Sequence, residues 1–357
     1  MRISFVVAGR MVVGGGLRVI FEYANRLTLK GHQVTILWPQ RNEEPDGLAG
    51  FADRLRALIY LQRPPEGPRW FDLKARLKPI PNPSERFVPK GDIIVATRWD
   101  TAEWVNGYSD AKGIKCYLIQ SYEVWDGPKD RVEATYRMPL NKIAVSSWLK
   151  TLVESISGQE VYGPVVNGVD FDMFYNPEKV YHNPRRIGMV YDPTIRKGTA
   201  DGLFAFELVR RQFPEVEFVM FGKDFRGVDV PEYVEYHHDP PQDMLREIYS
   251  SCDIWVMPSW LEGLGLVAME AMACKCAVIC ADIPPVRDIG VPGETMLVYP
   301  PRNPLALADA IIDLIRNEDK LRRLSTAGYR YIRRFTWDRA VDQLEKIFLD
   351  LIEQSYP

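Results

Sequence analysis

The chain has 357 residues, a length that favours two domains, and its 46% hydrophobic and 26% charged residues are typical of an ordinary folded protein. Its formal net charge of -3 gives no global reason to expect a nucleic-acid partner. No stretch approaches the roughly 20 apolar residues of a membrane helix, and the apolar run after Met1 is too short for a signal peptide. The five cysteines lie mostly in apolar runs, so we expect reduced core thiols in a cytoplasmic protein.

The first forty residues predict a strand, a glycine loop, a helix and a second strand. Residues 3–8 are a short apolar run, Gly14, Gly15 and Gly16 follow it, and apolar residues then recur at helical spacing. Because a helix joins them, the two strands should lie parallel. Further strands of this half are predicted at residues 92–97, 115–120 and 142–147.

Residues 39–89 are rich in proline and less regular, and we interpret them as an excursion from the first domain. Within this segment, aromatic and aliphatic residues alternate with cations in the manner of a basic amphipathic helix. We favour an ordinary half-buried helix over one resting on a membrane surface. The residues concerned are Arg69, Trp70, Phe71, Leu73, Lys74, Arg76, Leu77 and Lys78.

The second half repeats the same order of elements. It predicts a strand at 185–191, a loop at 192–202, a helix at 203–212 and a strand at 216–222. The fold class is therefore α/β, with two doubly wound domains, and ligands should bind at the carboxyl ends of strands in the cleft between them. The other strands expected in this half are residues 234–238, 253–259 and 276–281.

The run from Ser259 to Cys276 raises a physical problem, because Glu262 and Glu270 flank an almost wholly apolar stretch. A buried carboxylate without a partner is costly, so either one glutamate is solvated or both meet a ligand. Residues 266–273 are strong helix formers, and the glycines before them allow a ligand close to the backbone. The amino end of such a helix is a ready anion site.

The chemistry of these residues indicates a nucleotide-sugar. Glu270, about two turns into the helix, can accept hydrogen bonds from sugar hydroxyls, and Glu262 can do the same for a second sugar. Arg196 and Lys197 supply cations for a diphosphate between the two sugars.

Several segments resemble the family-four (group 1) retaining glycosyltransferases of the GT-B fold. Residues 258–282 resemble that family's segment of two glutamates eight positions apart, and residues 196–198 resemble its diphosphate-binding loop. Residues 165–174 are similar to its interdomain signature, residues 14–37 to its glycine loop and first helix, and residues 335–348 to its last helix. The resemblance spans residue 1 to about residue 350.

The resemblance implies two Rossmann-like domains: an acceptor-side domain of residues 1–168, completed by a helix at 337–357 that crosses back, and a donor-side domain of residues 169–336. It implies transfer of a sugar from a nucleotide-diphosphate donor to a hydroxyl of a glycan or lipid-linked saccharide, with retention, as in polysaccharide biosynthesis. The catalytic residues it implies are Glu262, Lys197 and Arg196. Donor-binding residues would be Glu270, Gly263, Leu264, Gly265, Leu266, Gly222 and Lys223, and residues of the acceptor side or cleft would be Gly15, Gly16, Trp99, Asp100 and Tyr122.

The chain departs from the family's pattern in three places. Val190 and Tyr191 stand where a glycine-arginine pair is common, Tyr122 stands for a usual histidine, and Lys275 replaces a usual glycine. No paired-aspartate motif lies in a suggestive loop, so we expect neither a metal nor a cofactor.

Three alternatives stay open: a nucleotide-sugar epimerase or hydrolase on the same fold, a catalytically silent sugar-nucleotide-binding protein, and a dinucleotide-dependent oxidoreductase. The glycine spacing of the first loop disfavours the last of these. The sequence leaves open the base, the sugar, the acceptor, the linkage, the oligomeric state and contact with a membrane surface.

Overall fold

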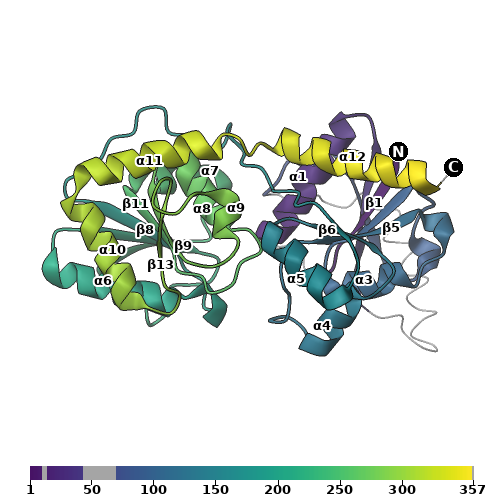
Figure 1. Cartoon of the computed structure of the whole chain (residues 1–357), viewed down its shortest axis with the longest axis horizontal. Coiled ribbons are helices and arrows are strands. Elements are labelled where there is room, and N and C mark those ends of the chain that lie inside the picture. The colour runs from purple at the N-terminus through teal and green to yellow at the C-terminus, as the bar shows by residue number, and fades with distance from the viewer. Residues whose placement is uncertain (10–13, 43–69, 356–357) are drawn as a thin grey trace. The chain divides into compact units, whose positions relative to one another are not determined.

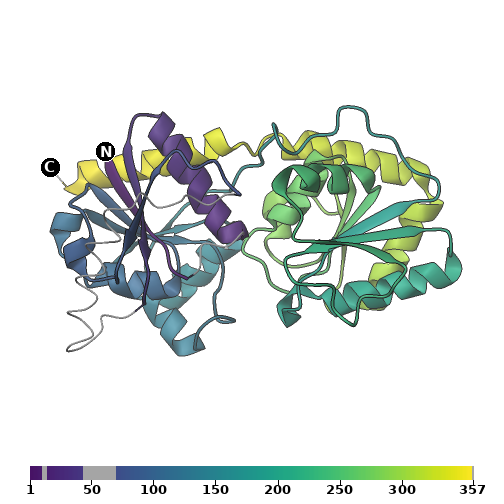
Figure 2. The same ribbon diagram turned by 180° about the vertical axis from the view of Figure 1, so that it is seen from behind.

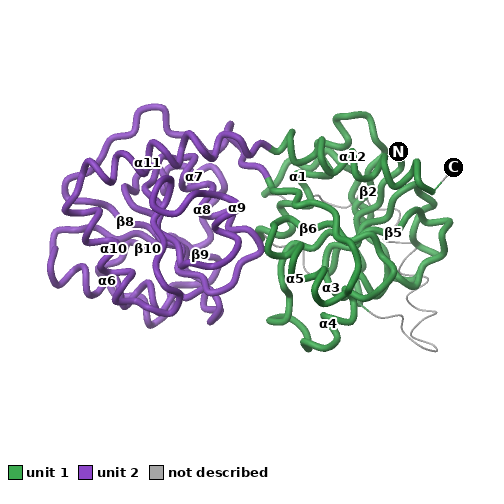
Figure 3. The backbone as a smooth tube through the Cα atoms, in the orientation of Figure 1, with its two compact units in different colours: residues 1–167, 337–357 green, residues 168–336 purple. Residues whose placement is uncertain are grey.

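The computed structural model describes residues 1–9, 14–42 and 70–355 (Figure 1). The chain forms two compact units, which Figure 3 distinguishes by colour. Unit 1 comprises Met1–Asn167 and Trp337–Pro357, and unit 2 comprises Gly168–Thr336. The unit boundary therefore lies one residue before the boundary expected from the sequence. Most of the proline-rich excursion, including Arg69, lies outside the described residues.

Unit 1 is built on a seven-stranded sheet whose strand order is β3-β2-β1-β4-β5-β6-β7. Every pairing is parallel, and the central strand β4 is buried along its whole length because helices cover both faces. The strands are β1 (Arg2–Val6), β2 (Gln33–Pro39), β3 (Arg76–Ile80), β4 (Ile93–Ala96), β5 (Ile114–Ile119), β6 (Asn141–Ala144) and β7 (Val161–Tyr162).

The helices of unit 1 include one from the far end of the chain, α12 (Trp337–Ser355), which packs beside α1 (Figures 1 and 2). The Trp337 ring meets the Tyr23 ring edge-on with centroids 5.4 Å apart. Lys30 Nζ lies 2.9 Å from Asp342 Oδ1. An apolar contact and a surface ion pair thus attach the last helix to the first. The other helices are α1 (Gly15–Leu29), α3 (Trp99–Asn106), α4 (Lys129–Tyr136), α5 (Ser147–Ser157) and the single turns η1 (Glu85–Phe87) and η2 (Asp110–Lys112).

Unit 2 repeats the topology with a six-stranded parallel sheet in the order β10-β9-β8-β11-β12-β13. The strands are β8 (Arg186–Val190), β9 (Glu217–Gly222), β10 (Val234–His238), β11 (Ile254–Met257), β12 (Ala277–Ala281) and β13 (Leu297–Tyr299). The helices are α6 (Thr199–Gln212), α7 (Gln242–Ser251), α8 (Leu266–Ala273), α9 (Val286–Ile289), α10 (Pro304–Arg316), α11 (Glu318–Ile332) and the turn η3 (Ile195–Lys197).

The prediction of a helix near residues 70–78 is wrong. Residues 76–80 form β3, which pairs in parallel with β2 at the edge of the sheet. The ring centroids of Trp70 and Phe71 each lie 5.4 Å from that of Phe21 on α1. These aromatics therefore pack on the unit's own core, and the basis for a membrane-binding helix here is lost.

Other expectations shift at element boundaries. Gly15 and Gly16 are not in a loop, because α1 begins at Gly15. Helix α6 begins at Thr199, four residues earlier than expected, so the second loop is shorter. The short strands β3, β7 and β13 were not predicted, since each has too few apolar residues to show a period.

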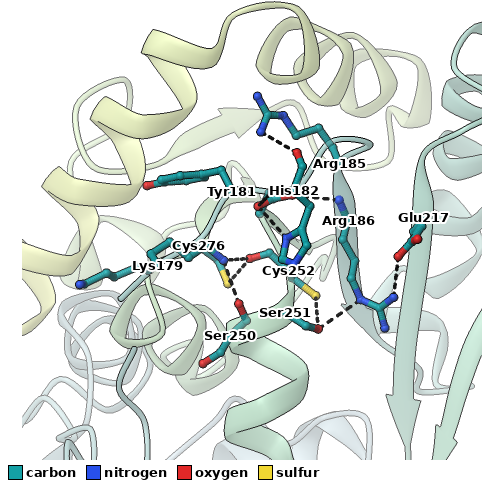
Figure 4. A network of polar contacts seen from close by, with 12 residues as sticks. Lys179, Tyr181, His182, Arg185, Arg186, Glu217, Ser250, Ser251, Cys252 and Cys276 are labelled. Carbon is teal, nitrogen blue, oxygen red and sulfur yellow. Dashed lines mark hydrogen bonds and ion pairs between the residues drawn. The ribbon is translucent and has the colours of Figure 1, made fainter. Parts of the chain in front are cut away.

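Polar groups at the amino ends of the unit 2 strands are paired within the unit (Figure 4). Asp253 is fully buried and accepts hydrogen bonds from the backbone N–H groups of His182 and Arg186, both at 3.0 Å. Lys179 donates from Nζ to the carbonyl oxygen of Ser250 at 3.0 Å (Figure 4). These contacts hold the segment before β8 against the sheet and leave the opposite edge for a ligand.

Candidate functional site

The strand order of unit 2 reverses between β8 and β11, which lie side by side in the sheet. In open α/β sheets, ligands bind outside the carboxyl ends of the strands at such a switch point. Residues 191–198 follow β8 and residues 258–265 follow β11. Both predicted donor-binding loops therefore emerge at the same point of one sheet.

The two loops are in direct backbone contact. The N–H of Trp260 donates to the carbonyl oxygen of Arg196 at 2.7 Å. Gly198 has a left-handed φ of 65°, and a Cβ added there would lie 2.1 Å from the carbonyl oxygen of Pro258. Only glycine fits at this position, because a side chain would be strained and would also collide with the second loop.

Lys197 and Glu262 form an ion pair across these loops. Lys197 Nζ donates to Glu262 Oε1 at 2.6 Å, and the two side chains are 24% and 14% exposed. An ammonium has three donors, so Lys197 can hold Glu262 and still face an incoming anion. The sequence placed both residues at the site and did not predict that they would pair.

Glu270 lies in the second turn of α8, as expected, and it too has a protein partner. The Tyr249 hydroxyl, from α7, donates to Glu270 Oε2 at 2.9 Å. Tyr249 is fully buried against Trp255, with ring centroids 4.5 Å apart, and burial raises the pKa of its hydroxyl. It therefore stays protonated and keeps donating. The two glutamates are thus stabilised by an ion pair and by a buried hydroxyl, a solution the sequence did not suggest.

Two helices begin at this edge with glycine as their N-cap and no side-chain cap: α6 after Gly198 and α8 after Gly265. The first amides of each helix, together with the positive end of its dipole, favour an anion. Leu264 points into the core with 3% exposure, Gly263 is buried, and Leu266 is the first residue of α8. The Leu264 side chain is therefore turned away from a ligand, whereas the amides at the start of α8 can meet one.

Gly222 and Lys223 stand at the carboxyl end of β9, next to β8. A Cβ on Gly222 would lie 2.6 Å from the carbonyl oxygen of Tyr191, so a side chain is excluded there. Burial lowers the pKa of Lys223, while Asp239 and other nearby carboxylates oppose that shift. Beside this strand, the exposed Phe225 ring stacks on His238 with centroids 4.1 Å apart.

The residues proposed for the acceptor side lie in unit 1. Trp99 is 8% exposed, and its backbone N–H donates to Glu123 Oε2 at 2.9 Å. Asp100 Oδ1 accepts from Arg98 Nε at 3.1 Å. Trp99 and Asp100 thus take part in contacts within the unit, at the start of α3.

Tyr122 and the two glycines also lie in unit 1. The Tyr122 hydroxyl donates to Glu133 Oε1 at 2.5 Å. Gly15 and Gly16 form the first turn of α1, where a Cβ on Gly16 would meet the Gln120 side chain at 3.7 Å. That distance is an ordinary contact, so packing does not require glycine at residue 16.

Glu123 is a titratable group that the sequence did not single out. It follows β5 and is 9% exposed, and burial raises the pKa of its carboxyl to about 8 although the Trp99 N–H and Arg98 oppose the shift. Arg98 also reaches Asp126 Oδ2 at 2.6 Å. This edge of unit 1 therefore carries several carboxylates around one guanidinium.

Among residues 1–9, 14–42 and 70–355, no group of three or more histidine, cysteine or acidic side chains could hold a metal ion. All five cysteines are buried and free. Within the same described ranges, no helix is both long and apolar enough to cross a membrane.

The sequence of unit 2 matches a known family. Residues 173–331 match the model of the family described as glycosyl transferases group 1. Over these residues, somewhat less than half of the chain, the sequence is similar to that family. The matched range contains Lys197, Glu262 and Glu270, and the family resemblance expected from the sequence is confirmed.

Curated relatives match over part of their length. The D-inositol 3-phosphate glycosyltransferase of Corynebacterium diphtheriae is 29% identical over 125 residues, which are 35% of this chain and 29% of that protein. The phosphatidyl-myo-inositol mannosyltransferase of Mycobacterium tuberculosis is 27% identical over 227 residues, 58% of this chain and 59% of that protein. The matched regions thus span less than two thirds of these relatives.

Solved structures match over nearly the whole chain. Sucrose-phosphate synthase from Thermosynechococcus elongatus has a TM-score of 0.74 at 16% identity and covers 99% of both chains. Anabaena HepE in complex with UDP-glucose has a TM-score of 0.77 at 14% identity, covering 98% of this chain and all of that one. At such identities the likeness shows the fold, and it confirms the predicted GT-B class with its two α/β sheets.

Two site contacts involve residues to which the sequence assigned no role. Tyr249 reaches Glu270 from 21 positions away on another helix, and Asp201 accepts the Trp260 indole N–H at 2.7 Å. Trp260 lies in the run from Ser259 to Cys276, but nothing about its residue type indicated a role. Such partners are set by tertiary packing, and only the buried position of Tyr249 in an amphipathic helix offered a weak signal.

Proposed function

We propose that the protein is a glycosyltransferase that moves a sugar, with retention, from a nucleoside-diphosphate sugar to a hydroxyl of a glycan or lipid-linked saccharide. The observation that carries the proposal is the Lys197–Glu262 pair, 2.6 Å apart at the switch point of a unit whose sequence matches the glycosyl transferases group 1 family. The solved HepE complexes with UDP and UDP-glucose, and the relatives named as glycosyltransferases, support the donor class.

In this proposal each group of unit 2 has one task. The amide groups at the starts of α6 and α8 and the cations Arg196 and Lys197 hold the diphosphate. Glu262 accepts hydrogen bonds from the transferred sugar, and Glu270, fixed by Tyr249, accepts them from the ribose.

Transfer breaks the bond between the anomeric carbon and the diphosphate oxygen and forms a bond from the same face to the acceptor oxygen. The departing phosphate oxygen takes the acceptor's proton. Negative charge grows on the diphosphate as the bond breaks, so Lys197 and the helix amides stabilise the transition state more than the ground state. Because protein groups compensate this negative charge, we propose that turnover needs no metal and survives EDTA.

A thermal-shift screen against UDP, GDP, ADP and dTDP tests donor binding first. A ligand that binds only the native state, at about 100 times its Kd, stabilises it by about 2.7 kcal/mol. We expect one base to raise Tm clearly above the others, and that nucleotide's sugars then serve as donors with and without saccharide acceptors. Absence of any shift contradicts the proposal, while free sugar released equally fast without an acceptor indicates a hydrolase.

A further inference from the structure

Trp260 connects three segments around the Lys197–Glu262 pair. Its backbone N–H donates to the Arg196 carbonyl oxygen at 2.7 Å. Its indole Nε1–H donates to Asp201 Oδ2, in the first turn of α6, at 2.7 Å. Both hydrogen bonds reach the chain on either side of Lys197, so Trp260 spans the turn that carries the lysine.

The ring of Trp260 is held from a third direction. Arg302 lies in the loop between β13 and α10, and its guanidinium carbon is 4.6 Å from the Trp260 ring centroid. Arg302 has a left-handed φ of 62°, a conformation that costs a non-glycine residue free energy and that the surroundings must stabilise. A cation over an indole face is an attractive contact, and it fixes the plane of the ring.

The other hydrogen bonds of the turn are local and join Asp192 to Thr194 and Thr199. The Lys197 N–H bonds only locally, to the Thr194 carbonyl oxygen at 2.9 Å, and Ile195 is 77% exposed. The turn η3 is three residues long, too short to hold its own geometry. The hydrogen bonds of Trp260 to Arg196 and Asp201 therefore fix the turn that carries Lys197, while the ion pair with Glu262 holds the Lys197 ammonium itself.

We propose that Trp260 is a positioning residue that aims Lys197 at the donor diphosphate through its hydrogen bonds to Arg196 and Asp201. The inference rests on the proposed glycosyltransferase function for its catalytic consequence. Its structural part, coupling of the two loops by Trp260, stands without that function. Trp260 itself need not touch the substrate.

Two variants remove the same hydrogen bond from opposite ends. Trp260→Phe keeps an aromatic ring below Arg302 and loses the indole donor, and Asp201→Ala removes the acceptor. Asp201→Asn is the matched control, because its side-chain oxygen can still accept. Small displacements at an active site can cost up to about a hundredfold in rate, so we expect kcat to fall roughly tenfold in the first two variants. Asp201→Asn should stay within about twofold of the wild type.

Combination with Lys197→Ala separates positioning from a general structural effect. If Trp260 acts through Lys197, the double variant Trp260→Phe/Lys197→Ala should have the kcat of Lys197→Ala alone. Multiplying losses in the double variant contradict the proposal. So does a Trp260→Phe enzyme with unchanged kcat.

Amide hydrogen exchange tests the coupling without any substrate. In Trp260→Phe and Asp201→Ala, exchange should accelerate across residues 192–198 and stay unchanged at the amino end of β8, with Asp201→Asn resembling the wild type. Unchanged exchange in both variants overturns the inference. If one variant folds poorly, unchanged exchange in the other variant alone overturns it. If the wild-type protein turns over no nucleotide-sugar while the exchange result holds, the proposed function fails and the positioning of the loop stands.

Discussion

Units 1 and 2 have the same strand order about their switch points but carry different side chains at the carboxyl edge. In unit 1 the segment after β4 places Arg98 beside Asp100 and Asp126, with Glu123 nearby. In unit 2 the loop after β8 carries two cations, Arg196 and Lys197, and Lys197 pairs with Glu262 from the loop after β11. Among the described residues, carboxylates outnumber cations in the segments after β4 and β5, whereas the loop after β8 brings two cations next to an uncapped helix start.

The comparison shows that the strand order determines where a ligand can bind, while the side chains at that edge determine which class of ligand is favoured. An anionic diphosphate is favoured by the cations and uncapped helix starts of unit 2 and disfavoured by the carboxylates of unit 1. We infer that unit 1 suits a neutral, hydroxyl-rich ligand, in agreement with the proposed acceptor side. The predictions below test this contrast in order of expected effect.

Removing the Lys197 ammonium should have the largest effect. Loss of one preorganised donor to a developing negative charge costs about 2.7–4 kcal/mol, so Lys197→Ala should lower kcat by about a hundred- to a thousandfold with a smaller change in the KM for the donor. Steady-state kinetics with the donor found by thermal shift measure the split. A rise in KM alone reduces Lys197 to a simple binding residue.

The control for this variant is another lysine of the same unit. Lys320 Nζ lies 2.5 Å from Asp313 Oδ2, an ion pair with no place in the site. Lys320→Ala should leave kcat and KM unchanged, because exposed pairs of this kind contribute about 0–1 kcal/mol to stability.

The two glutamates of unit 2 should fail differently. Glu262→Gln should lower kcat roughly ten- to a thousandfold, for a loss of about 1.4–4 kcal/mol, because the transferred sugar gains positive charge as the bond breaks. Glu270→Gln should raise the donor KM with kcat little changed, since the ribose undergoes no chemistry. Tyr249→Phe removes the hydroxyl that donates to Glu270, so it should resemble Glu270→Gln.

Free nucleoside diphosphate, which has a ribose but no donor sugar, provides the control for the pair. Its affinity, measured by calorimetry, should fall in Glu270→Gln and hold in Glu262→Gln. The reverse pattern means that the two roles are exchanged. Equal losses of affinity in both variants indicate that the two glutamates have a structural role.

The buried Glu123 carboxyl of unit 1 should make the stability of the folded protein depend on pH. Burial raises the pKa of Glu123 to about 8 in the folded protein, above the roughly 4.3 of an exposed glutamate. The folded state therefore binds its proton more tightly, and Glu123's contribution to stability is present at low pH and is lost as pH rises from about 4 through about 8. We expect this loss to be at most a few kcal/mol.

Denaturant unfolding of the wild type and of Glu123→Gln at pH 5, 6.5 and 8 measures this contribution. The glutamine can still accept the Trp99 N–H and does not ionise, so the wild type should lose more stability than the variant between pH 5 and pH 8. Parallel pH dependences of the two proteins show that Glu123 titrates normally.

The smallest expected effect concerns the turns that precede two corresponding strands. Before β5 stands Gly113, with φ 111°, where a Cβ would lie 2.7 Å from the Asp92 backbone. Before β12 stands Lys275, with φ 59°, whose ammonium donates to the Pro177 carbonyl oxygen and lies 5.0 Å from the Tyr329 ring centroid. The left-handed conformation thus explains the glycine that the family pattern expects at Lys275.

Comparison of Lys275→Gly with Lys275→Ala isolates this backbone conformation, since both variants lose the same side-chain contacts. A left-handed non-glycine residue costs about 1–2 kcal/mol, so the glycine variant should be more stable than the alanine variant by about 1 kcal/mol in urea unfolding. Equal stabilities of the two variants contradict this account of the turn.

The sequence alone determined the elements whose signal is local. Long apolar runs predicted the buried strands of both sheets, and the helix formers after Gly265 predicted α8 with its observed bounds. The family motifs brought Lys197, Glu262 and Glu270 to one unit, and the comparison with known families confirmed the class. A periodic pattern of side chains is enough for such predictions because it depends only on the chain's own geometry.

Only the tertiary structure decided how the charges of the site are compensated. Glu262 meets Lys197 from 65 positions away, Glu270 meets Tyr249 from 21, and Trp260 meets Asp201 from 59. The edge strand β3 was mistaken for a helix, because its five residues gain their hydrogen bonds from β2 and not from a pattern of their own. Such partners are selected by the need to satisfy buried polar groups once the sheet has formed, and that need has no local trace in the sequence.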